Sequence, residues 1–214
     1  MRQTCSACLI LAVLTATGAA AVQTDVDLLA IDEALTLIRS GSAPELARFN
    51  ELYRVKVEKA PVDYLEVVTP FRRIVLTGTA RATAGDRGFG QRQAIDLLAE
   101  SGGRLDIHAE LTLNPLNTYI GVPDYVVAMI NRSGTRTTAT EVTRLSRWTA
   151  RLPGPPAVGP FLAPTIPRGA PLVGATIIGG FELKGLMPAG TYDVVVELGG
   201  EELARAAVVL SGMR

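Results

Sequence analysis

The hydrophobic pattern of this chain changes from helical to alternating at Gly102-Gly103. Before this point, apolar residues recur at the three- to four-residue spacing of amphipathic helices. After it, Leu105–Leu113 alternates apolar and polar residues strictly over nine positions, which predicts a half-buried antiparallel strand. The sequence therefore predicts an α+β protein, with a helical domain over residues 22–103 and an antiparallel β-sandwich domain over residues 104–214.

The helical domain is expected to contain about four helices. The first covers residues 25–40 and the second starts at Ser42, whose capping box with Glu45 satisfies free amides at the helix start. The second helix is expected to run through Val57 to the break at Pro61. Residues 62–68 fit either a strand or a short helix. The remaining helices are predicted over residues 70–85 and 90–101, and the small residue Gly78 is expected to allow close helix contact.

The first 21 residues have the layout of a cleaved export signal. Arg2 is followed by the apolar run 7–17 and by small residues up to Ala21, and the run is too short to span a bilayer. Cys5 and Cys8 both lie in this segment, so the mature chain has no thiol nucleophile, disulfide or zinc–thiolate site. We therefore expect a periplasmic or secreted protein with no transmembrane segment in its mature chain.

The charge balance argues against nucleic acid as a partner. The net charge is −2 over residues 22–103 and +1 over residues 104–214, so neither half has the basic excess of a nucleic-acid-binding domain.

The β half carries one recognisable local pattern. Strands are predicted over 125–130, 172–183, 192–198 and 204–210, and Gly199-Gly200 forms a hairpin turn. The segment Leu186–Val196, with Tyr192 at the start of a strand, resembles the E–F corner of immunoglobulin-like sandwiches. Without core cysteines, the chain is similar to cysteine-free bacterial or fibronectin-type sandwiches. This resemblance implies a binding or structural role more often than catalysis.

Three polar residues of the strand at 105–113 are candidates for chemistry. Asp106, His108 and Glu110 project from one strand face, where such a row can hold a metal or move protons. Polar residues are also typical of the solvated face of an antiparallel strand, and this second interpretation is favoured over a chemical site. His108 is the only histidine, which excludes a two-histidine metal site, and no serine-nucleophile motif is present. We therefore expect no cofactor, no metal and no catalytic residues.

Three other segments are candidates for binding. Arg87 and Phe89 lie in a glycine-rich loop that could bind phosphate at a helix start, or simply form a turn with Phe89 tucked beneath it. An arginine cluster around Trp148 could bind an acidic glycan or a partner carboxylate, or be a solvated charged surface. The apolar connection 116–123 is either an exposed binding loop or a loop folded over the helices. The candidate residues of the last two segments are Arg144, Arg147, Trp148, Asn117 and Tyr119.

These observations favour an exported, non-catalytic interaction or scaffold protein of the cell envelope, with a protein as its partner. Two alternatives stay open. One is a carboxylate-dependent hydrolase acting on glycans, with Asp106, Glu110 and Asp124 as candidate acids. The other is a carrier that binds a small ligand in a pocket between the two domains.

Overall fold

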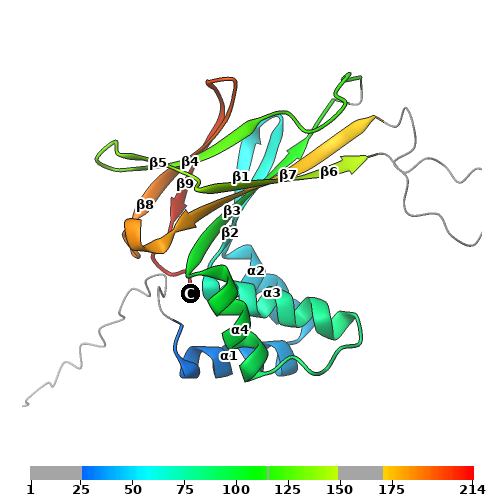
Figure 1. Ribbon diagram of the computed structural model, residues 1–214, viewed down its shortest axis with the longest axis vertical. Coiled ribbons are helices and arrows are strands. Elements are labelled where there is room, and N and C mark those ends of the chain that lie inside the picture. Colours follow the sequence, from blue (N-terminus) through cyan, green and yellow to red (C-terminus); the bar gives the residue numbers. More distant parts are fainter. Residues whose placement is uncertain (1–25, 115, 149–170) are drawn as a thin grey trace, which may run out of the picture.

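The computed structural model describes residues 26–114, 116–148 and 171–214, which combine α-helices with two antiparallel sheets (Figure 1). The expected export signal and most of the proline-rich connection before residue 171 lie outside the described residues. Within the described part of the chain, none of the helices has the length and apolar character needed to cross a membrane. The α+β class predicted from the sequence is confirmed.

The helices are α1 (Leu28–Ser40), α2 (Ala43–Glu51), α3 (Pro70–Thr83) and α4 (Gln91–Ser101). Their starts are capped by side chains, since Asp27 accepts a hydrogen bond from the Ala30 amide and Thr69 accepts one from the Arg72 amide. Helices α1, α3 and α4 pack around a core that includes Ile31, Leu35, Phe71, Ile74 and Ala94. Gly78 lies directly against Ile38 and Phe89, so the close contact predicted at this glycine is confirmed.

The second helix is shorter than predicted. It ends at Glu51, and the following residues form the hairpin of β1 (Arg54–Lys59) and β2 (Val62–Val68). The physical reason is that Val55 and Val57 alternate with charged residues, a period that suits a strand with one buried face. This hairpin pairs with β3 (Arg104–Thr112), so helices account for only part of residues 22–103.

The first sheet has five strands in the order β1-β2-β3-β7-β6, and the second has four in the order β5-β4-β8-β9. The remaining strands are β4 (Tyr125–Asn131), β5 (Arg136–Thr138), β6 (Glu141–Trp148), β7 (Leu172–Glu182), β8 (Thr191–Leu198) and β9 (Glu201–Val209). Both sheets contribute to one hydrophobic core, to which β3 gives Leu105, Ile107 and Leu111 and the second sheet gives Met129 and Val194.

The contact expected of a tyrosine corner is present in the second sheet. The Tyr192 hydroxyl accepts a hydrogen bond from the Met187 amide at 2.6 Å, and its ring is buried. This contact supports the interpretation of the segment before β8, while the relationship to immunoglobulin-like domains stays a prediction.

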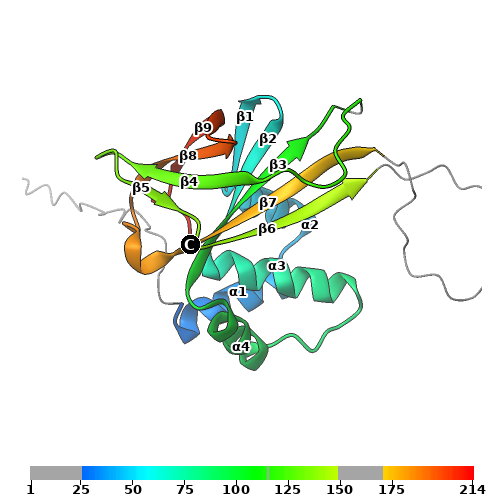
Figure 2. The same cartoon turned by 45° about the horizontal axis from the view of Figure 1, so that its top comes forward.

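The helices gather on one side of the sheets (Figure 2). Arg73 of α3 donates to the Asp106 carboxylate of β3 at 2.7 Å, which links the helices to the outer face of the five-stranded sheet. Two regions are therefore candidates for a functional site: the junction of α3 with the sheet, and the surface between the helices.

Candidate functional site

The outer face of β3 carries a polar row, which we define as Asp106, His108 and Glu110; its two carboxylates are buried and its histidine is half-buried. Asp106 is only 6% exposed and Glu110 only 9%. The expectation that these residues form a solvated strand face is therefore wrong. The reason is tertiary: α3 and the side chain of Arg147 cover a face that the strand pattern alone would leave in water.

Every carboxylate of the polar row is engaged by arginine. Asp106 lies 2.7 Å from Arg73 Nη2 and 2.8 Å from Arg104 Nε. Glu110 pairs with Arg147 and accepts a hydrogen bond from the Thr176 hydroxyl at 2.7 Å. Buried carboxylates require such partners because the cost of removing a charge from water is otherwise uncompensated.

Next to the row, Arg72 of α3 is completely buried. It pairs with Glu66 of β2, donates to the Val67 carbonyl at 2.6 Å, and lies over the Tyr53 ring at 4.8 Å. A guanidinium with this many partners holds a helix and a sheet together.

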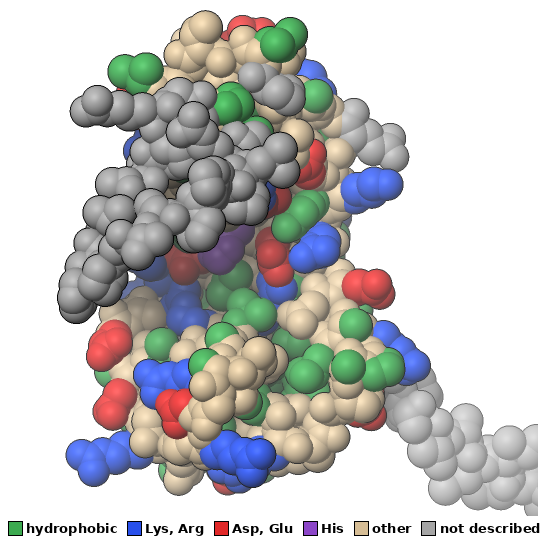
Figure 3. Space-filling view, turned by 90° about the vertical axis from the view of Figure 1, so that its right-hand side faces the viewer, with side chains coloured by type: hydrophobic (Ala, Val, Ile, Leu, Met, Phe, Trp, Pro, Cys, Tyr) green, Lys and Arg blue, Asp and Glu red, His purple; other side chains and the backbone are tan. Residues whose placement is uncertain are grey.

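His108 lies at the centre of this junction. Figure 3 shows the histidine in a hollow between the sheet and the helices, with acidic and basic side chains around it. Burial lowers the pKa of His108 below its ordinary value of 6.5, although the carboxylates of Asp106 and Glu66 act in the opposite direction. The histidine therefore favours its neutral form in the folded protein.

The three acids considered for a hydrolase do not share one face. Asp106 and Glu110 lie on the outer face with their arginine partners, whereas the Asp124 side chain is 96% exposed and lies 3.4 Å from Arg144. Arg144 and Arg147 are three residues apart on β6, so they point to opposite faces of the sheet. Among the described residues, no group of three or more histidine, cysteine, aspartate or glutamate side chains is arranged to hold a metal ion.

The arginine cluster is likewise divided between the two faces, and Trp148 Nε1 donates to the hydroxyl of Ser146 at 3.0 Å. In the glycine-rich loop, Phe89 is buried beneath Arg81 while Arg87 is exposed, as expected for a turn with the ring tucked under it.

In the connection 116–123, Asn117 Nδ2 donates to the Leu172 carbonyl at 2.7 Å, which attaches the loop to β7. Tyr119 and the neighbouring Ile120 are exposed. The tip of this loop is open to solvent, as the binding interpretation requires.

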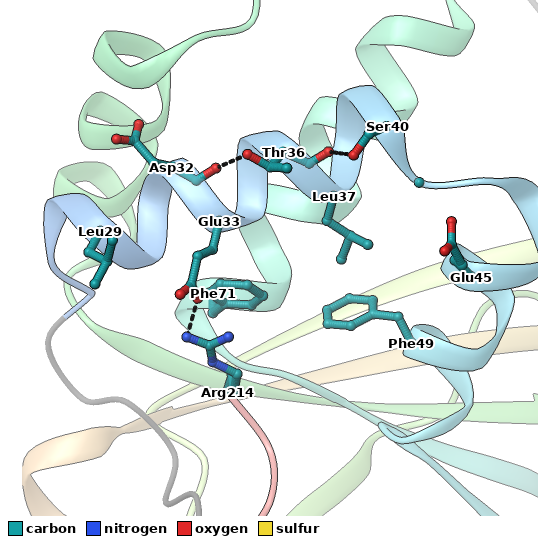
Figure 4. A pocket seen from close by; sticks show the side chains of 11 residues that line it. Leu29, Asp32, Glu33, Thr36, Leu37, Ser40, Glu45, Phe49, Phe71 and Arg214 are labelled. Carbon is teal, nitrogen blue, oxygen red and sulfur yellow. Dashed lines mark hydrogen bonds and ion pairs between the residues drawn. The ribbon is translucent and has the colours of Figure 1, made fainter.

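A different site, not predicted from the sequence, lies between the helices. We call it the helical groove, a cavity of about 630 Å³ between α1, α2 and the start of α3 (Figure 4). Its lining residues are Leu29, Asp32, Glu33, Thr36, Leu37, Ser40, Gly41, Glu45, Phe49, Phe71 and Arg214. The apolar part is formed mainly by the leucines of α1 and the rings of Phe49 and Phe71, whose centroids are 6.1 Å apart.

The polar groups of the groove lie at its rim. Glu33 pairs with Arg214, whose guanidinium lies 5.0 Å from the centroid of the Phe71 ring. Glu45 accepts a hydrogen bond from the Ser42 amide at 2.7 Å, and this bond lowers the pKa of Glu45, which therefore stays ionised at neutral pH. The groove thus combines an aromatic floor with an acidic edge.

One signal in the sequence could have indicated the helical groove. Helix α1 carries apolar residues on more than the one side that meets the core: Ile31 and Leu35 are buried, but Leu28 and Leu29 are 58% and 68% exposed. A helix with a second apolar side needs another surface to cover it.

Comparisons of the chain with protein-family models, with curated proteins and with solved structures find no match. The function is therefore inferred from the geometry of the polar row and the helical groove.

Proposed function

We propose that this chain is an exported, non-catalytic interaction protein that binds an apolar segment of a partner protein in the helical groove. The observation that carries this proposal is the open cavity of about 630 Å³ with Phe49 and Phe71 in its wall. An Ig-like arrangement of the two sheets would serve as the rigid support behind the helices. The site of action would be the periplasm or the medium.

The shape of the groove supports a polypeptide as its occupant. The lining residues of α1 extend from Leu29 to Gly41, a length of about 18 Å at the helical rise per residue. A cavity this long, bordered by helices and floored by aromatic rings, suits the apolar side of a helix or an extended segment. The exposed Leu29 at one end would gain burial when such a segment binds.

The chemistry of the polar row supports a non-catalytic role. A general acid or nucleophile must be free to reach a substrate, whereas Asp106 and Glu110 are buried against arginines and Thr176. Asp106 instead links α3 to the sheet through Arg73, and Glu110 links β3 to β6 and β7.

The test is site-specific photo-crosslinking in the native host. A photoreactive phenylalanine analogue replaces Leu29 in the groove, and the matched control replaces Leu28, the adjacent exposed residue that lines a separate cavity beside α4. We expect one protein adduct from position 29, lost when Phe49→Ala is added, and no equivalent adduct from position 28.

The crosslinked peptide is identified by mass spectrometry and synthesised, and it should bind the purified protein. Leu29→Ser should weaken this affinity, and Leu28→Ser should leave it unchanged. Equal crosslinking from both positions, or binding that ignores Leu29→Ser, would contradict the proposal. An adduct with a small apolar molecule instead of a protein would replace it with a carrier function.

A further inference from the structure

We infer that the helical groove selects a positively charged partner segment, in which arginine or lysine residues flank an apolar side chain. This inference rests on the proposed function and adds the chemical class of the partner. It is drawn from the charges of the rim, the hydrogen-bonding state of its hydroxyl groups, and the placement of Arg214.

The rim has more negative than positive charge. Asp32, Glu33 and Glu45 contribute three carboxylates, and Arg214 is the one basic residue in the lining. Glu33 is paired with Arg214, whereas Asp32 forms no ion pair with any described residue. Glu45 bonds to its own helix start, keeps its charge and has no cationic partner among the described residues, whereas the Asp32 carboxylate points outward from α1 at the edge of the groove (Figure 4).

The hydroxyl groups of the wall cannot serve an anionic ligand well. The Thr36 hydroxyl donates to the Asp32 carbonyl at 2.8 Å, and the Ser40 hydroxyl donates to the Thr36 carbonyl at 2.6 Å. Their hydrogens are therefore used within α1, which leaves their lone pairs for a ligand. The wall therefore offers hydrogen-bond acceptors to a ligand. A lysine or arginine side chain suits this wall because it carries only hydrogen-bond donors.

Arg214 already demonstrates how a guanidinium fits this site. It lies over the Phe71 ring at 5.0 Å while it pairs with Glu33, so it uses both the aromatic floor and the acidic edge (Figure 4). The neighbouring Phe49 ring and the Glu45 carboxylate, both on α2, provide the same two elements for a second cation (Figure 4). An acidic segment would instead meet unpaired carboxylates, and like charges at an interface are unfavourable.

The experiment is selection from a displayed library of random dodecapeptides on the purified protein. The counter-selection uses Leu29→Ser, which removes apolar contact in the groove. We expect enriched peptides with net positive charge and at least one large apolar residue. Synthesised examples should bind the double variant Asp32→Asn, Glu45→Gln about tenfold more weakly than the native protein.

Two further variants serve as controls for that measurement. Glutamine at position 45 can maintain the capping box, so helix α2 should keep its helical circular dichroism in the double variant. Arg214→Ala frees Glu33 for the ligand, and we expect it to bind the basic peptides more tightly while the affinity of neutral peptides changes little.

The outcomes separate the charge inference from the proposed function. Enrichment of neutral or acidic apolar peptides that depend on Leu29 would leave the binding function in place and overturn the selection for positive charge. Basic peptides that bind the double variant as tightly as the native protein would also overturn the selection for positive charge. Failure of any peptide to be enriched above the Leu29→Ser protein would overturn both.

Discussion

The polar row and the helical groove use charge in opposite ways. On the outer face of the five-stranded sheet, each carboxylate of the polar row has an arginine partner: Asp106 pairs with Arg73 of α3, and Glu110 pairs with Arg147 of β6. In the groove, Arg214 pairs with Glu33 while Asp32 and Glu45 lie beside apolar surface without a cation. The matched charges hold elements of the fold together, whereas the unmatched charges of the groove belong to the surface that we propose binds a partner.

This division follows from the cost of desolvation. A buried ion that loses its partner is destabilising by several kcal/mol, so the junction can keep its arginines only if each is matched. Carboxylates at the edge of an open groove stay hydrated, so leaving them without a cation costs little folding free energy. The two regions should therefore respond very differently to substitution.

The largest effect is expected at Arg72. Arg72→Ala leaves Glu66 without its partner and removes the bonds to the Val67 carbonyl and Asn50, so the free energy of unfolding should fall by about 3–5 kcal/mol. Urea denaturation measures this change. The matched control is Arg81→Ala, which breaks a half-exposed pair with Asp86 and should cost less than about 1 kcal/mol. Equal losses in the two variants would show that the junction is not held by its buried arginine.

An intermediate effect on the free energy of unfolding is expected when His108 is titrated. Burial lowers its folded-state pKa, while Asp106 and Glu66 oppose this shift and Arg72 and Arg73 add to it. Protonation therefore favours the unfolded chain: the stability contributed by the neutral imidazole is present above about pH 6.5 and is lost as the pH falls below that value. His108→Gln removes this titration, so its free energy of unfolding should decrease less between pH 7.5 and 5 than that of the native protein. Parallel pH profiles would mean that the histidine is not buried against the sheet.

The smallest effect on stability is expected at the groove. Asp32→Asn should change the free energy of unfolding by less than about 0.5 kcal/mol, because Asp32 is exposed and forms no ion pair with the described residues. The same substitution should weaken binding of basic peptides. A loss of stability comparable to that of Arg72→Ala would place Asp32 in the structural network instead of the binding surface.

Local signals in the sequence predicted the elements whose patterns are self-contained. The capping box at Ser42 indicated a helix start, the alternation of Leu105–Leu113 indicated β3, and Tyr192 indicated the corner before β8. Each of these features depends on residues within a few positions of one another, so it can be read without the tertiary fold.

The features that were missed depend on distant contacts. The segment that forms β1 continues directly from a helix, and its short alternation of Val55 and Val57 becomes a strand through pairing with β2 and burial of Val57 in the core. The pattern of β3 separated two faces but could not show that Arg73 would cover the polar one. The helical groove needs three helices and Arg214 in place together, and only the exposed apolar residues of α1 hint at it in the sequence.

The most direct test of the central claim is the position at which a selected basic peptide binds, measured by amide chemical-shift changes in the isotopically labelled protein. If the peptide binds in the helical groove, the shifts cluster in α1, α2 and the start of α3, with Arg214, and Leu29→Ser abolishes them. The amides of β6 and of the connection 116–123 should stay unchanged. Shifts centred on either of those segments, with the groove unaffected, would contradict the account.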